Sequence, residues 1–148
     1  MRKVHLTFSS QFDNIDLVDH VTEACLKFAG FDASTTEHMT LAIREATANA
    51  IKHGNMQDPD KIAEVIFELD DENIRIEISD QGEGFRPEEV PNPLAPENLL
   101  KGTGRGIFLM RQLMDDVNFA FGNGFGTRVI LRKRIPEPAS AAQGEEEE

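Results

Sequence analysis

One segment of the chain pairs a carboxylate with an amide at a spacing that could support chemistry. Glu45 and Asn49 are four residues apart, so on an α-helix their side chains project next to each other, with Cβ atoms roughly 5–6 Å apart. Oxygen ligands of these two kinds suit Mg²⁺, which keeps several waters and also binds substrate phosphates. Alternatively, the Glu45 carboxylate stays free of metal and accepts a proton from an attacking hydroxyl group. Because this spacing is very common, the pair alone is better explained as a polar helix face.

Two glycine clusters follow this segment. In residues 80–84 (Asp-Gln-Gly-Glu-Gly), Asp80 ends an expected strand and enters backbone with few Cβ atoms. A carboxylate placed there could accept a hydrogen bond from the exocyclic amine of a purine whose ring lies against the glycines. Residues 102–106 (Gly-Thr-Gly-Arg-Gly) precede an expected helix, and the amides at a helix N-terminus favour an anion such as a phosphate. The spacing of the glycines in residues 102–106 matches neither the dinucleotide fingerprint nor a Walker loop. Each glycine cluster is a weak signal alone, and it becomes informative only in combination with the other cluster and with Glu45 and Asn49.

Composition and charge place these residues in one acidic globular domain. A chain of 148 residues with 39% apolar and 28% charged residues fits a single core. The N-terminus has no apolar stretch of the kind found in signal peptides or membrane-spanning helices, and the lone Cys25 excludes an intrachain disulfide and a thiolate zinc cluster. We therefore expect a cytoplasmic protein without membrane contact. The net charge of −12 argues against direct nucleic-acid binding.

The hydrophobic pattern predicts the elements that must position the chemical residues. The expected order is a strand at 4–8, helices from 14 or 16 to 30 and from 34 to 54, strands at 62–69 and 74–80, a helix from about 106 to 115, and strands at 117–121 and 127–132. Short turns between successive strands imply a mostly antiparallel mixed sheet with helices on one face, an α+β two-layer sandwich. The prolines in residues 87–101 predict a functional loop, a lid. We assign residues 1–135 to this domain and expect 136–148 to be a disordered acidic tail.

Local signals predict how the two long helices begin and which face they bury. Asn14 or Asp16 is expected to cap the first helix, and Gly30 to end it in the left-handed conformation. Residues 34–37 (Ser-Thr-Thr-Glu) are typical of a capping box that opens the second helix. The apolar residues expected on one face of the first helix are Val18, Val21, Cys25 and Phe28.

Taken together, the three segments resemble the motifs of a known superfamily. Residues 45–54 resemble the N box of the GHKL superfamily, which includes histidine kinases, gyrase B and MutL. Residues 80–84 resemble its G1 box, and residues 102–110 (Gly-Thr-Gly-Arg-Gly-Ile-Phe-Leu-Met) resemble its G2 box. The short chain, the His53-Gly54 ending and the form of the last motif are most similar to the anti-sigma-factor serine kinases of the RsbW and SpoIIAB type. This resemblance covers roughly residues 4–132 and implies the Bergerat ATP-binding fold.

The resemblance also implies roles for individual residues. Asn49 would be a ligand of the Mg²⁺ that bridges the ATP phosphates, Glu45 the general base for an acceptor serine, and Asp80 the residue that recognises the adenine amine. The further residues expected around ATP are Lys52, Gly82, Gly84, Gly102, Gly104, Gly106 and Thr127, with Lys101, Thr103 and Arg105 added for their places in the second glycine cluster. We interpret His53 as a residue that caps or packs the helix end, not as a phosphorylated histidine.

Two functions follow from this reading. The first is an ATP-dependent serine protein kinase and anti-sigma factor that phosphorylates a serine of an anti-anti-sigma (STAS) protein, binds a sigma factor and forms a homodimer, as the resemblance implies. The second is an ATP-binding regulatory module that sequesters a protein partner without kinase activity. The ATPase part of a histidine kinase is disfavoured, since no helical segment with a phospho-acceptor histidine precedes the domain. The two functions differ in whether Glu45 is needed.

Overall fold

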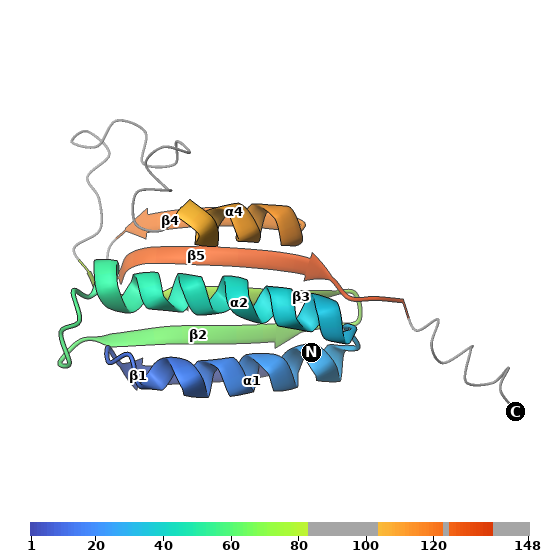
Figure 1. The fold of residues 1–148 in the computed structure, drawn as a ribbon, viewed down its shortest axis with the longest axis horizontal. Helices are drawn as coiled ribbons and strands as arrows, with labels where there is room; N and C mark the ends of the chain where they lie inside the picture. Colours follow the sequence, from blue (N-terminus) through green and yellow to red (C-terminus); the bar gives the residue numbers. More distant parts are fainter. Residues whose placement is uncertain (83–103, 123–124, 138–148) are drawn as a thin grey trace, which may run out of the picture.

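The computed structural model describes residues 1–82, 104–122 and 125–137. Their strands form one sheet, in the spatial order β1-β2-β3-β5-β4 (Figure 1). Every pair of neighbouring strands is antiparallel, which confirms the antiparallel α+β sandwich. The strands are β1 (Arg2–Ser9), β2 (Ile62–Leu69), β3 (Asn73–Ser79), β4 (Asp116–Gly122) and β5 (Phe125–Arg134).

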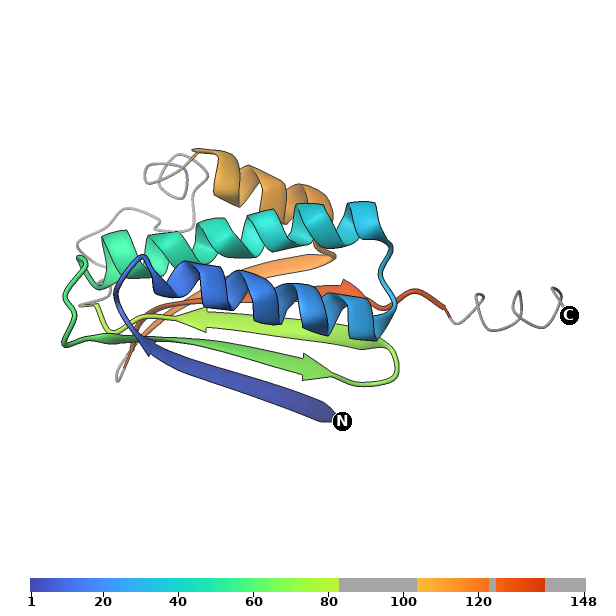
Figure 2. The ribbon, with the colours of Figure 1, turned by 60° about the horizontal axis from the view of Figure 1, so that its bottom comes forward.

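The helices cover one face of this sheet, as the two views of the ribbon show (Figures 1 and 2). They are α1 (Asn14–Ala29), α2 (Ala33–Asn49) and α4 (Gly104–Leu113), and the π-helical turn η1 (Ala50–Gly54) continues α2. Helix α2 lies between α1 and α4 and packs against both. No helix within the described ranges combines the length and apolar character that crossing a membrane requires.

The core lies between the helices and the inward side of the sheet. Successive side chains of a strand point to opposite faces, so the alternating residues Ile74, Ile76 and Ile78 of β3 all face the helices and are fully buried. Met39 and Ile43 of α2 are equally buried against them. The period-two and helical patterns of the sequence therefore predict the core of both layers.

The start of α1 differs from the expectation. Asp13 is the N-cap residue, its side chain makes no capping hydrogen bond, and Asn14 is already the first helical residue. The Asn14 side chain instead donates a hydrogen bond from its Nδ2 to the Ser9 carbonyl at 2.9 Å, which ties the helix start to the end of β1. The expected caps at Asn14 or Asp16 are therefore wrong, because the helix begins directly after Asp13 and both residues lie in its first turn.

The start of α2 differs as well. Asp32 is the N-cap residue, and its Oδ1 accepts a hydrogen bond from the Thr35 amide at 2.7 Å. The helix thus begins at Ala33, and the capping box expected at residues 34–37 is wrong. The short Asp32 side chain accepts a hydrogen bond from an amide of the first turn, which is the function of an N-cap residue. Ser34 lies inside the helix and does not have this function.

The end of α1 agrees with the expectation except at one apolar residue. Gly30 has φ 100°, the left-handed conformation predicted for it. Val18 and Cys25 are buried, but Phe28 is 64% exposed, so its placement on the buried face is wrong. The Arg2 guanidinium lies over the Phe28 ring, 4.5 Å from its centroid. A cation over an aromatic ring is favourable at an exposed site, and it shields part of this side chain.

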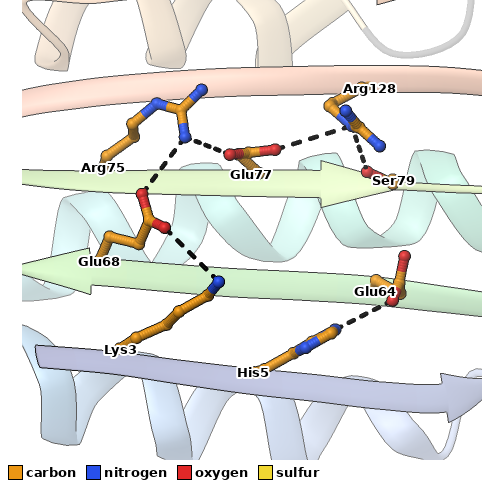
Figure 3. A network of polar contacts seen from close by, with 8 residues as sticks. All are labelled: Lys3, His5, Glu64, Glu68, Arg75, Glu77, Ser79 and Arg128. Carbon is orange, nitrogen blue, oxygen red and sulfur yellow. Dashed lines mark hydrogen bonds and ion pairs between the residues drawn. The ribbon is translucent and has the colours of Figure 1, made fainter.

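The sheet face away from the helices carries a network of charged side chains (Figure 3). Glu77 lies at its centre, in contact with the Arg75 guanidinium and 3.7 Å from Arg128 Nε. Arg75 also pairs with Glu68 at 3.3 Å, and Glu68 with Lys3 at 3.8 Å. The network crosses four strands, β1, β2, β3 and β5. Lys3 and Arg75 each stand opposite Glu68 in register, whereas Arg128 stands opposite Ser79 and reaches Glu77 diagonally.

Candidate nucleotide site

The carboxylate of Asp80 is the centre of the candidate site. Asp80 follows β3 directly and is 5% exposed. Its backbone continues the ladder with β5, since its amide donates to the Thr127 carbonyl at 3.1 Å and its carbonyl accepts from the Gly126 amide at 2.9 Å. Its side-chain Oδ1 accepts from the amides of Gly82 at 2.9 Å and Thr127 at 3.1 Å. The sheet therefore fixes both the backbone and the side chain of Asp80.

Three glycines enclose this carboxylate. A Cβ added to Gly54 would lie under 3.0 Å from Asp80 Oδ2, and one added to Gly126 would lie under 3.0 Å from Asp80 Oδ1. A Cβ on Gly82 would meet the Gly54 carbonyl at a similarly short distance. Real Cβ atoms do not approach other atoms so closely, so larger residues at these positions would displace the Asp80 side chain or the backbone around it.

Burial makes this carboxyl group a weaker acid than usual. Removal from water raises the pKa of Asp80, and the amide hydrogen bonds from Gly82 and Thr127 and the positive charge of Lys61 lower it only in part. A carboxylate that is buried and held by two amides is oriented before any ligand arrives. Such a group can accept a hydrogen bond from a ligand amine without further reorganisation.

Helix α2, which carries Glu45 and Asn49, continues into η1 and so leads to Gly54 beside Asp80. Both side chains are half-buried, and neither forms a hydrogen bond with another residue in the described part of the chain. The oxygens of a carboxylate and an amide, one turn apart and without a partner among the described residues, fit the donor set that Mg²⁺ prefers. Lys52 in η1 is exposed. The observed helix thus brings together the residues that spacing alone suggested.

The π-helical turn η1 joins this helix to Asp80. It runs on from Asn49 without a break and ends at Gly54, the residue that lies against the Asp80 carboxylate. Two non-glycine residues with positive φ follow, Met56 at 55° and Gln57 at 58°. π-Helical turns and left-handed residues are both unfavourable locally and are concentrated at functional sites.

The matches to known proteins agree with this geometry. Residues 8–133 match the family model of the histidine kinase-like ATPase domain. The serine-protein kinase RsbW of Oceanobacillus iheyensis is 31% identical over 114 residues, which cover 73% of this chain and 71% of the relative. RsbW of Staphylococcus epidermidis is 30% identical over 121 residues, which cover 77% and 76%. This chain belongs to the RsbW-type branch of the histidine kinase-like ATPase family.

A solved structure shares the fold of this RsbW-type chain. It contains the RsbU and RsbW domains of a Mycobacterium tuberculosis protein, with a TM-score of 0.63 and 20% identity. The match covers 91% of this chain and spans about a third of the other, 32%. At this identity the similarity supports the fold, and it agrees with the α+β sandwich expected from the sequence.

The structure places some of the other expected site residues of the RsbW-type chain and leaves others outside its described ranges. Thr127 lies beside Asp80 and binds it through its backbone. The first turn of α4, which contains Gly104, Arg105 and Gly106, lies at the same end of the molecule as η1 (Figures 1 and 2). The residues outside the described ranges are Gly84, Lys101, Gly102, Thr103 and the lid expected at 87–101. The tail expected from residue 136 lies outside them from residue 138 onward.

Sequence reasoning missed two residues that border Asp80. Lys61 precedes β2, and its charge acts on the Asp80 carboxyl group. Asn55 is fully buried and donates or accepts hydrogen bonds with three separate segments. An asparagine after His-Gly reads as an ordinary turn residue, so the sequence offers no signal for its burial.

Proposed function

We propose that this RsbW-type protein is a serine kinase that transfers the γ-phosphate of ATP to a serine of an anti-anti-sigma STAS protein. The observation that carries the proposal is the direct contact between Gly54 and the Asp80 carboxylate. This contact joins the helix that bears Glu45 and Asn49 to the residue suited to bind adenine. Phosphoryl transfer asks a protein mainly for positioning and charge neutralisation, and this arrangement supplies a frame for both.

The residues of α2 have separate tasks in this mechanism. Asn49 would hold Mg²⁺, which would supply positive charge to the phosphates of ATP. Glu45 accepts the proton of the acceptor serine as the serine oxygen forms its bond to the γ-phosphorus and the bond from that phosphorus to ADP breaks. The half-buried position of Glu45 and its lack of a described protein partner leave its carboxylate available for this proton.

The site residues that lie apart from α2 bind the nucleotide. Asp80 accepts a hydrogen bond from the adenine amine, and Thr127 supports it from the start of β5. The amides in the first turn of α4 bind the phosphates, as helix N-termini do for anions. Lys52 adds a positive charge from η1, and Arg105 adds one from α4.

The partners and location belong to the same proposal. We propose that the protein binds a sigma factor as well as the STAS protein, acts as a homodimer and works in the cytoplasm. The relatives are serine-protein kinases of the RsbW type, and this shared class supports the kinase part of the proposal. A pull-down from native cell extract with and without nucleotide would identify both partners.

Labelled ATP decides between a kinase and an ATP-binding module. The purified chain is incubated with γ-labelled ATP, Mg²⁺ and STAS proteins of the same organism, alongside Glu45→Gln and STAS variants that lack the acceptor serine. We expect label on the serine with the natural chain and a loss of at least about 100-fold with Glu45→Gln, the scale of general-base catalysis. ATP binding without transfer to any STAS protein would favour the regulatory module instead.

A further inference from the structure

The buried Asn55 side chain connects three segments that are distant in sequence. Its Nδ2 donates to Ser10 Oγ at 2.6 Å and to the Ile62 carbonyl at 2.8 Å. Its Oδ1 accepts from the Gln81 amide at 2.6 Å. A backbone amide can only donate and a carbonyl can only accept, so these partners fix the orientation of the Asn55 amide. Asn55 therefore uses its donors and its acceptor, as a fully buried polar group should.

The partners of Asn55 are also bound to one another. Ser10 Oγ donates to the Lys61 carbonyl at 2.9 Å, and the Ile62 amide donates to Gln81 Oε1 at 2.7 Å. The end of β1, the start of β2 and the segment after β3 are thus held together around one amide group. Closed networks of this kind lose more than one contact when a member is removed.

The position of Asn55 along the chain relates this network to the candidate site. Asn55 follows Gly54 directly, and Gln81 follows Asp80 directly. The hydrogen bond from Gln81 to Asn55 therefore links the two residues next to the contact between Gly54 and the Asp80 carboxylate. Gly54 in turn ends the π-helical turn that continues α2. The hydrogen bond between Gln81 and Asn55 therefore connects the end of the helix that bears Glu45 and Asn49 to the segment that contains Asp80.

We propose that Asn55 is a positioning residue that sets Asp80 for recognition of the adenine amine. The inference rests on the proposed function, because it concerns the nucleotide that Asp80 binds. It assigns Asn55 no contact with ATP. The Asn55 side chain influences Asp80 indirectly, through Gln81 and Gly54. A residue at position 55 that lacks both the donor and the acceptor of asparagine would allow the Asp80 segment to shift away from η1.

Asn55→Asp is the closest change in shape, since it replaces one NH₂ group by oxygen. The new oxygen would face the Ile62 carbonyl, so a hydrogen bond becomes a repulsion between acceptors. Asn55→Ser is the second variant, because a serine is too short to reach the Gln81 amide. Both are made in a Met56→Gly background, where glycine relieves the positive φ of an exposed residue and offsets part of the lost stability.

The measurement compares ATP with inosine triphosphate, which lacks the exocyclic amine. Calorimetry on the background protein comes first, and if it binds neither nucleotide, the proposed function is wrong and Asn55 is assigned no role in it. With binding established, we expect the background to prefer ATP by about 10-fold or more, the effect of one hydrogen bond to a charged group. We expect both Asn55 variants to reduce this preference at least about fivefold.

The ratio separates positioning from a merely structural role, because lost stability alone lowers both affinities equally. Ser10→Ala is the matched control: it removes the contact toward β1 and leaves the hydrogen bond with Gln81, so the preference for ATP should be retained. An unchanged ratio in folded Asn55 variants would overturn the proposal. Failure of both variants to fold would overturn it as well, since Asn55 would then serve the fold and not the orientation of Asp80.

Discussion

Replacement of Asp80 by asparagine should separate nucleotide recognition from folding. The variant keeps the side-chain oxygen that accepts the amides of Gly82 and Thr127. It replaces the other oxygen by an NH₂ group, which cannot accept a hydrogen bond from the adenine amine. A hydrogen bond to a charged group contributes about 1.5–3 kcal/mol, which corresponds to about 10- to 150-fold in the dissociation constant. We expect ATP affinity to fall by that factor, and the free energy of unfolding to change by less than about 1 kcal/mol.

The pH dependence gives a second measure of the same carboxyl group. Burial raises the pKa of Asp80 in the folded protein, so the folded state binds this proton more tightly than the unfolded state does. The ionised form therefore costs stability at pH values above the raised pKa, and this cost disappears as the pH falls toward the ordinary value of about 3.9. Asp80→Asn removes the cost. We expect the variant to gain stability relative to the natural chain at neutral pH, and to lose that advantage in acid.

Two measurements check these expectations. Calorimetric titration with ATP and Mg²⁺ gives the dissociation constants at several pH values, and urea unfolding without nucleotide gives the stabilities. The affinity of the natural chain should approach that of Asp80→Asn as the pH falls, because protonation removes the charged acceptor. A folded Asp80→Asn protein with unchanged ATP affinity would refute the reasoning and remove Asp80 from base recognition.

Two further predictions concern the surroundings of the site and the contact between the first two helices. Gly54→Ala should weaken ATP binding at least about 10-fold and cost about 1–3 kcal/mol of stability in urea unfolding, because its Cβ would meet the Asp80 carboxylate. Gly30→Ala is the control: it has φ 100° and open space around it, so it should cost about 1 kcal/mol while ATP affinity stays the same. Arg44→Met should cost about 1 kcal/mol at pH 7, because it leaves the partly buried Asp19 carboxylate without its cation. Burial already raises the pKa of Asp19, so this loss should shrink as the pH falls through that pKa, and an equal loss at pH 7 and pH 4 would contradict the assignment.

The sequence predicted the elements wherever a period runs through many residues. The strand expected at residues 62–69 is β2 with the same bounds, and the helix expected to end at Gly54 does so through η1. The helix starts were misplaced because several short polar residues compete there. Asp13, Asn14 and Asp16 are all residue types that can cap a helix. Asp13 holds the N-cap position, and the Asn14 side chain binds the Ser9 carbonyl, a contact that a single sequence does not report.

The candidate site likewise contains features that the local sequence predicts and features that depend on distant contacts. The spacing of Glu45 and Asn49 and the place of Asp80 at a strand end were visible, because each depends on neighbours within one element. The enclosure of Asp80 was not, since Gly54 and Thr127 approach it from 26 and 47 residues away. Such contacts follow from the register of β3 against β5 and from the length of α2, and a single sequence does not report them. The chemical roles themselves stay predictions for the experiments above.

In the proposed reaction, the alignment of Glu45 with the nucleotide depends on the place where the end of α2 meets the Asp80 segment. Asp80 is fixed by the ladder between β3 and β5, and Glu45 is fixed by α2, which packs against both other helices. Each is held by a regular element, and the end of α2 meets the Asp80 segment at Gly54 and Asn55, so a shift at either residue would change the distance between Glu45 and Asp80. Misplacement of reacting groups by about 1 Å can cost about 100-fold in rate. Gly54 permits the close approach to Asp80, and the buried Asn55 side chain holds the Asp80 segment in place through its hydrogen bond with Gln81. Because a kinase must align a protein serine with the γ-phosphate, we expect substitutions at Gly54 or Asn55 to lower its rate of phosphoryl transfer.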